Sequence, residues 1–260
     1  EVCLPEPSHK VWKSLSTKQK KDQIRRMQVY AAMIDRVDQN IGKLLLKIKE
    51  LNEEDDTLIM FASDNGSSAE NVNTGIGEVG TITRWASLQK DWANVSNTPF
   101  RYWKNLSHEG GIRTPFIAYW PKVIKDQGGF NRQPIHFIDV MATVQDITGA
   151  EYPKTFKDLP VTPMQGESFL PALKEGQLPK RKKPIFFEYS SGGAVRDGDW
   201  KLVTKNFTKT KGIEKNTNKW ELYDLSKDLT EIKNLAKENP EVVQRLSRHW
   251  QDWYDEAYVR

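Results

Sequence analysis

The sequence "TLIMFASDNG" (57–66) sets the fold class of this chain. Its apolar run ends abruptly at Asp64 and Asn65, which Gly66 follows. An uninterrupted apolar run of this length is typical of a strand covered on both faces, as in a mainly parallel sheet. We therefore predict a buried strand over 57–63 in an α/β fold, with a carboxylate and a carboxamide at its carboxyl end.

The segment before this strand predicts one long helix over 16–51. Ser16 and Gln19 have the spacing of a capping box, and apolar residues then recur at intervals of three and four. Gly42 interrupts the pattern at a cost of about 1 kcal/mol, which predicts close packing against another element. The polar residues 52–56 are expected to form the turn into the strand.

The segment after the strand begins with a long region of weak pattern. Residues 64–100 show no periodicity and contain four glycines, so a long functional loop is expected. A second buried strand is predicted over 116–120, and a short helix over 136–150 that ends at Gly149.

The C-terminal part changes character and predicts a separate antiparallel subdomain. Three short aromatic segments are separated by turn residues: 184–189, 194–204 and 219–225. The Asp-Gly-Asp at 197–199 favours a tight hairpin, and helices are predicted over 228–237 and 240–257. We therefore divide the chain into an α/β core over 1–180 and an α+β subdomain over 181–260.

Composition excludes some classes of function. The 260 residues contain 39 Lys and Arg against 35 Asp and Glu, for a net charge of +4, which is too weak to predict nucleic-acid binding. No apolar run reaches the roughly 20 residues that cross a bilayer, so no membrane partner is expected. The single cysteine, Cys3, excludes an internal disulfide.

Asp64 and Asn65 offer oxygen ligands at the end of a strand, where ligands bind in open α/β sheets. A carboxylate and an amide oxygen suit Ca²⁺ or Mg²⁺ better than zinc. Asp-Asn-Gly is also ordinary turn chemistry, and on these residues alone an Asx turn is the simpler interpretation. Two ligands do not complete a site for a cation that takes six or more oxygens.

A second polar cluster lies in "TPFRYWKNLSHEGGIRTPFIAYWP" (98–121). Lys104 and His108 could hold an oxyanion such as sulfate or phosphate, or could belong to a salt-bridged loop, and both interpretations stay open. Glu109 and Arg113 are expected to pair with each other. The two glycines that follow Glu109 predict a sharp turn or a close backbone approach.

Four blocks in order now resemble a known family. They are "YAAMIDRVDQNIGKLL" (30–45), "TLIMFASDNG" (57–66), "FRYWKNLSHEGGIRTPFIAYWP" (100–121) and "AVRDGDWKLV" with "KWELYDLSKDLTEIKNLA" (194–236). Together they resemble the C-terminal half of bacterial-type type I sulfatases, of the alkaline-phosphatase-like superfamily. The resemblance implies the C-terminal part of that α/β sandwich, followed by a small antiparallel sheet with helices.

The resemblance also implies chemistry for particular residues. Asp64 and Asn65 match two calcium ligands of the family, and Lys104 matches the lysine that contacts the substrate sulfate. His108 falls where some bacterial members carry a histidine beside that lysine. The implied activity is hydrolysis of sulfate esters by a formylglycine nucleophile with Ca²⁺, with sulfated glycans as the expected substrates.

Other parts of the family pattern are missing from the sequence. The N-terminal acidic metal ligands and the formylglycine motif, C-x-P-x-R or C-x-A-x-R, are not found, because "CLPEP" (3–7) has Pro7 in place of the arginine. His9 is expected in a surface loop. We therefore expect a C-terminal portion that is inactive alone, has the N-terminal half of the sulfatase as partner, and is periplasmic or secreted.

Two alternatives of other classes remain open at this stage. A phosphoesterase or phosphotransferase of the same superfamily often uses two zinc ions, for which the oxygen donors of Asp64 and Asn65 are less suited. A non-catalytic module derived from the fold could bind carbohydrate or serve as a scaffold. Metal titration separates these, because a scaffold would not respond to calcium.

Overall fold

The chain folds into two compact units, each discontinuous in sequence. The computed structural model describes residues 11–126, 128–189, 192–205 and 220–258. The larger unit comprises residues 1–44, 62–116 and 184–260, and the smaller one comprises residues 45–61 and 117–183. Cys3, Pro7 and His9 lie outside the described residues. The segments that contain both predicted polar clusters belong to the larger unit.

The long helix α1 (Thr17–Glu50) begins as its sequence predicts. The backbone N–H of Ser16 donates to Oε1 of Gln19 at 2.9 Å, and the N–H of Gln19 donates to Oγ of Ser16 at 3.3 Å. This reciprocal pair confirms the capping box. The packing predicted at Gly42 is wrong, because a Cβ at that position would meet no atom within 4 Å.

Much of the apolar stripe of α1 is exposed. Arg26 is the only buried residue among those of this helix. The exposed large apolar residues of the helix are Ile24, Met33, Ile34, Val37, Leu44, Leu45 and Leu46. No helix in the described ranges is long and apolar enough to span a membrane. The helix therefore carries an apolar surface that this chain leaves uncovered.

The region 64–100 is more ordered than its sequence predicts. It contains a hairpin of β2 (Asn73–Gly75) and β3 (Arg84–Ala86), followed by the helix α2 (Lys90–Ser96). The prediction of a structureless loop is wrong because strands of three residues are too short to show an alternating pattern.

The predicted buried strands form β1 (Ile59–Ala62) and β4 (Phe116–Tyr119), which pair in a two-stranded sheet. The smaller unit also contains α4 (Ile138–Thr148), β5 (Thr155–Phe156), β6 (Leu159–Pro160) and α5 (Leu170–Glu175). Gly149 ends α4 with a φ of 68°, which confirms the predicted C-terminal stop. Both strands leave apolar side chains exposed, at Phe61, Ile117 and Tyr119.

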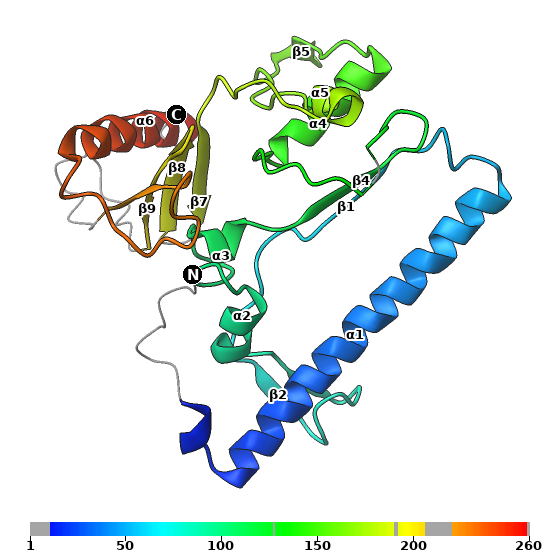
Figure 1. Ribbon diagram of the computed structural model, residues 1–260, viewed down its shortest axis with the longest axis vertical. Coiled ribbons are helices and arrows are strands. Elements are labelled where there is room, and N and C mark those ends of the chain that lie inside the picture. The colour runs from blue at the N-terminus through cyan, green and yellow to red at the C-terminus, as the bar shows by residue number, and fades with distance from the viewer. Residues whose placement is uncertain (1–10, 127, 190–191, 206–219, 259–260) are drawn as a thin grey trace. The chain divides into compact units, whose positions relative to one another are not determined.

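The C-terminal segments form one antiparallel sheet in the order β10-β9-β8-β7, as predicted (Figure 1). Its strands are β7 (Ile185–Tyr189), β8 (Gly192–Asp197), β9 (Trp200–Thr204) and β10 (Glu221–Asp224). Gly198 has a φ of 60° in the tight turn between β8 and β9. The Asp-Gly-Asp hairpin signal is thereby confirmed.

One face of this sheet packs against the last helix, α6 (Pro240–Tyr258). The fully buried core consists of Val195, Leu202 and Leu222 from three strands with Leu246 and Trp250 from the helix. The helix starts at Pro240, which suits a first helical position because its missing N–H needs no partner there. The predicted closing helix is confirmed.

The other predicted helix, over 228–237, is wrong. Turns occupy this region, and side chains take the backbone N–H groups that a helix would use. The Asp228 carboxylate accepts from the N–H of Ile232 and of Lys233, both at 2.8 Å, and the Asn234 side chain accepts the N–H of Ala236 at 3.0 Å. Asp and Asn compete with helix in this way through local side-chain hydrogen bonds.

Trp250 is the largest fully buried side chain, and its indole N–H donates to the carbonyl of Phe187 at 3.0 Å. We expect Trp250→Ala to lower the free energy of unfolding by about 3–5 kcal/mol, since it leaves a cavity between α6 and the sheet. Urea unfolding followed by circular dichroism measures this. Gln244→Ala, at an exposed position of α6, is the control and should change the value by less than about 0.5 kcal/mol.

Candidate functional site

Backbone contacts hold the two predicted polar clusters together. The N–H of Gly66 donates to the carbonyl of Gly111 at 2.9 Å, and the N–H of Lys104 donates to the carbonyl of Ser67 at 3.1 Å. A Cβ on Gly66 would lie 1.8 Å from the carbonyl oxygen of Gly110. The turn after β1 therefore approaches the loop before β4 closely enough to exclude any side chain at residue 66.

The glycine pair is required by packing on its other side as well. A Cβ on Gly110 would lie 2.3 Å from the carbonyl oxygens of Arg101 and Tyr102, and one on Gly111 would lie 1.9 Å from that of Leu106. The two glycines lie in the first turn of the short helix α3 (Glu109–Ile112), and the preceding loop folds back onto them. The close approach predicted from the sequence is confirmed.

Asp64 and Asn65 follow β1 after a single residue, Ser63. The side chain of Asp64 is exposed and that of Asn65 is half-buried, and within the described residues neither forms a side-chain hydrogen bond. The hydrogen bond expected of an Asx turn at Asp64 is therefore absent there. Two oxygen donors without partners fit a hard cation such as Ca²⁺. The described residues contain no group of three His, Cys, Asp or Glu that could complete such a site.

Lys104 lies in a strained loop that reaches the surface. Its side chain is 36% exposed, and its ammonium lies 3.7 Å from the carboxylate of the half-exposed Glu70. Tyr102 and Asn105, on either side, have φ values of 66° and 77°, a region that side chains disfavour. An exposed ion pair of this length is weak, so the ammonium can exchange its partner for an anion.

His108 has no exposed surface. Its Nε2 lies 3.1 Å from Oε2 of Glu221, and the edge of its ring meets the Tyr102 ring with centroids 4.7 Å apart. This position does not fit the direct sulfate contact expected from the sequence. The side chain instead faces the C-terminal sheet.

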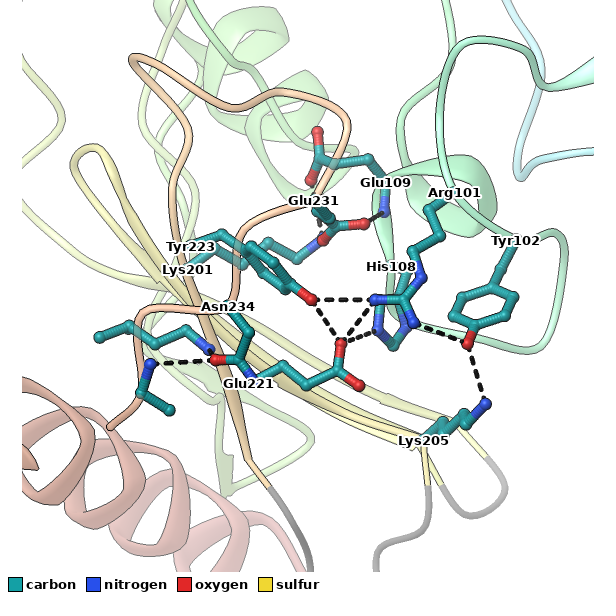
Figure 2. A network of polar contacts seen from close by, with 12 residues as sticks. Arg101, Tyr102, His108, Glu109, Lys201, Lys205, Glu221, Tyr223, Glu231 and Asn234 are labelled. Carbon is teal, nitrogen blue, oxygen red and sulfur yellow. Dashed lines mark hydrogen bonds and ion pairs between the residues drawn. The ribbon is translucent and has the colours of Figure 1, made fainter. Parts of the chain in front are cut away.

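Glu221, on β10, is the centre of a network of polar contacts (Figure 2). Its Oε2 accepts from Arg101 Nη1 at 2.8 Å and from the Tyr223 hydroxyl at 2.6 Å, besides its contact with His108. Burial acts to raise the pKa of Glu221, but the hydrogen bonds from His108 and Tyr223 and the charge of Arg101 lower it to about 2. Burial and the adjacent Glu221 raise the pKa of Tyr223. Glu221 is therefore an ionised carboxylate held by three partners.

A second network joins α3 to the same sheet. The predicted Glu109–Arg113 pair is confirmed at 3.3 Å, but Glu109 also pairs with the fully buried Lys201 at 2.8 Å. Lys201 contacts Glu231 at 2.7 Å, and Glu231 accepts the backbone N–H of Glu109 at 2.8 Å. Burial opposes ionisation of Glu109, and Lys201 overcomes it, so the pKa of Glu109 is lowered.

These partners of His108 and Glu109 leave only a weak signal in the sequence. Lys201 and Glu221 stand inside short strands, each between apolar or aromatic residues. A charged residue in such a place is either on a solvated face or buried with a partner. It belongs to a network of polar contacts only in the second case. Nothing local distinguishes the two cases.

Two family models match this chain. The family model for sulfatases matches residues 5–150, and the model for the C-terminal part of N-sulphoglucosamine sulphohydrolase matches residues 100–255. The chain belongs to the sulfatase family. Its fold is that of type I sulfatases of the alkaline-phosphatase-like superfamily.

Curated relatives match this sulfatase chain over most of its length. An uncharacterised sulfatase of Schizosaccharomyces pombe is 29% identical over 96% of this chain and 48% of its own length. The arylsulfatase of Klebsiella aerogenes is 31% identical over 68% of this chain and 40% of its own length. The N-acetylglucosamine-6-O-sulfatase of Bacteroides thetaiotaomicron is 28% identical over 88% of this chain and 36% of its own length. This chain thus spans about half or less of each relative.

Among solved structures, that of Ps i-CgsB superposes with a TM-score of 0.65. The sequence identity is 24%, and the match covers 90% of this chain and 43% of the other. At this identity the likeness supports the fold alone.

Because no side chain fits at Gly66, a substitution there should lower the free energy of unfolding. We expect Gly66→Ala to destabilise the sulfatase chain by about 1–3 kcal/mol, because the backbone at residue 110 must move away. Gly42→Ala is the matched control, since open space surrounds that helical position; it should stabilise by about 1 kcal/mol. Equal effects of the two substitutions in urea unfolding would contradict the close backbone contact.

The low pKa of Glu221 predicts a pH dependence. Its value falls from 4.5 to about 2 on folding, so the folded state binds fewer protons in this window. The stability that Glu221 contributes is then complete above about pH 4.5 and is lost as the pH falls toward 2. We expect Glu221→Gln to be less stable than the wild type at pH 6, with the difference shrinking below pH 4.

Urea midpoints measured from pH 6 to pH 2.5 test this dependence. Glu238→Gln removes an exposed carboxylate of the same subdomain and should follow the wild-type curve. A constant difference between Glu221→Gln and the wild type across the range would show that ionisation of Glu221 is not linked to folding.

Proposed function

We propose that this chain is the C-terminal part of a sulfatase and contributes metal ligands and a sulfate-binding lysine to the hydrolysis of sulfate esters. The observation that carries the proposal is the junction at Gly66. It fixes Asp64 and Asn65 beside the loop of Lys104 through two backbone hydrogen bonds. Family membership supports the same assignment.

The role proposed for Lys104 follows from its charge and position. Its ammonium is partly exposed and, among the described residues, has the half-exposed Glu70 as its counter-charge. A sulfate ester presents anionic oxygens that accept charge-assisted hydrogen bonds from such a group. Where negative charge grows on these oxygens during S–O cleavage, a fixed cation lowers the energy of the transition state.

Asp64 and Asn65 would hold calcium, the cation that the family uses. Their oxygen donors fit Ca²⁺ in kind, and neither is committed to a hydrogen bond among the described residues. Bound calcium would supply positive charge for the sulfate oxygens. The remaining ligands and the formylglycine nucleophile are proposed to come from the N-terminal half of the sulfatase, so the chain alone would be inactive.

The uncovered apolar side chains support this proposed partner. Exposed apolar side chains run along α1 from Met33 to Leu46. Phe61 on β1 and Ile117 and Tyr119 on β4 are exposed as well. A surface of this kind is unusual on a protein that stands alone and marks an interface. We infer that the N-terminal half of the same sulfatase packs on it.

Sulfated glycans are the proposed substrates. The relative from Bacteroides thetaiotaomicron is named for the 6-O-sulfate of N-acetylglucosamine and matches 88% of this chain. The arylsulfatase of Klebsiella aerogenes matches a smaller share, 68%. A sugar sulfate is accordingly the first substrate to test.

The complete sulfatase that contains this chain is the protein to assay. We expect Lys104→Ala to lower kcat/KM for N-acetylglucosamine 6-sulfate and for 4-nitrophenyl sulfate by about 100- to 1,000-fold, since it removes a cation from the transition state. Released sulfate is measured by ion chromatography. Lys47→Ala, at an exposed site of α1, should leave the activity unchanged.

Two results would contradict the proposed function. One is a faster hydrolysis of 4-nitrophenyl phosphate than of 4-nitrophenyl sulfate by the complete protein, which would favour a phosphoesterase. The other is sulfate release by the isolated 260-residue chain, which would remove the need for an N-terminal half.

A further inference from the structure

We propose that Glu221 is a positioning residue for Lys104, acting by clamping both ends of the loop that presents this lysine; the inference rests on the proposed function. Arg101 and His108 stand at the two ends of the loop, and Lys104 lies between them. Both end residues meet the same carboxylate oxygen, Oε2 of Glu221 (Figure 2).

The clamp is anchored in the C-terminal sheet, at the first residue of the strand β10. Glu221 pairs with Val203 in the ladder between β10 and β9, and its neighbour Leu222 is fully buried in the core. The hydroxyl of Tyr223 donates to the same Oε2 at 2.6 Å and fixes its direction. The carboxylate of Glu221 is therefore held by a contact within its own strand as well as by its contacts with the loop.

The loop between the two clamped ends has a strained backbone, although the N–H of Lys104 donates to the carbonyl of Ser67 at 3.1 Å and Nδ2 of Asn97 donates to the carbonyl of Tyr102 at 2.9 Å. Two of its residues, Tyr102 and Asn105, adopt the left-handed backbone region, which costs of order 1–3 kcal/mol each. Such a backbone persists only when its surroundings enforce it. The contacts of Arg101 and His108 with Glu221 add to these hydrogen bonds by holding the two ends of the loop.

His108 takes part in the clamp without touching a substrate. Its side chain has no exposed surface, whereas that of Lys104 is 36% exposed. The two residues are four positions apart, and they have different tasks: Lys104 meets the sulfate and His108 holds the loop end. We therefore assign His108 to positioning.

The consequence for the reaction is geometric. A displacement of about 1 Å of a group that contacts the reacting centre can cost about 100-fold in rate. Release of one clamped end would let the ammonium of Lys104 shift by such an amount while the fold survives. We expect Glu221→Gln, which keeps the shape of the side chain and removes its charge, to lower kcat 10- to 100-fold with a smaller change in KM.

A double-mutant cycle in the complete sulfatase tests the proposal. It compares Glu221→Gln, Lys104→Ala and the double variant, with sulfate release from 4-nitrophenyl sulfate as the readout. If Glu221 acts through Lys104, Glu221→Gln loses most of its effect once Lys104 is absent, whereas independent effects multiply. Asp197→Asn breaks an exposed ion pair on the same sheet and is the control, expected to keep wild-type kcat.

Each outcome bears on a different statement. Multiplying effects of Glu221→Gln and Lys104→Ala would overturn the positioning role and leave the proposed function standing. An enzyme that releases no sulfate from any ester would overturn the proposed function itself. An unchanged kcat in Lys104→Ala would overturn both the sulfate contact and the clamp. Should Glu221→Gln fail to fold, Arg101→Lys replaces it in the cycle, because it keeps the charge and loosens only one loop end.

Discussion

The backbone of Gly66 lies so close to Gly110 that no side chain fits between them. This contact brings together a strand end and a loop that are separated by more than thirty positions in the sequence. Asp64 and Asn65 directly precede Gly66 in the sequence, and Lys104 belongs to the loop that leads to Gly110. Everything proposed for the chemistry of this chain depends on that distance staying short, because a cation site and an anion-binding lysine can serve one substrate only if they are neighbours.

The C-terminal sheet supports this junction through buried charge. Glu221 holds the Lys104 loop, while Lys201 and Glu231 hold the first turn of α3. Buried ion pairs of this kind add little net stability, since desolvation offsets much of the attraction. These ion pairs contribute specificity instead, because each can form in only one arrangement of its partners. Contacts from the C-terminal sheet thus set the position of the Lys104 loop.

Local features of the fold were predictable from the sequence, and distant ones were not. The capping box at Ser16, the stop at Gly149 and the hairpin at Gly198 each depend on a few consecutive residues. The helix predicted over 228–237 failed because Asp228 and Asn234 compete for backbone N–H groups, and a pattern of apolar residues does not register such competition.

The site shows the same division. Asp64, Asn65 and Lys104 are proposed from motifs that resemble a family, whereas the close approach expected of the glycine pair is observed. The partners of His108 and Glu109 lie 113 and 92 positions away in the sequence. No periodicity or spacing connects residues so far apart, so their burial and their true contacts had to come from the structure.

The long separation between Arg101 and Glu221, 120 positions, also bears on how the molecule folds. Contacts of such high sequence separation form late, because the loop-closure entropy must be offset by other interactions first. During synthesis the lysine loop emerges well before β10, which follows it by more than a hundred residues. The loop of Lys104 therefore stays without this anchor until residues 221–224 of β10 have been made.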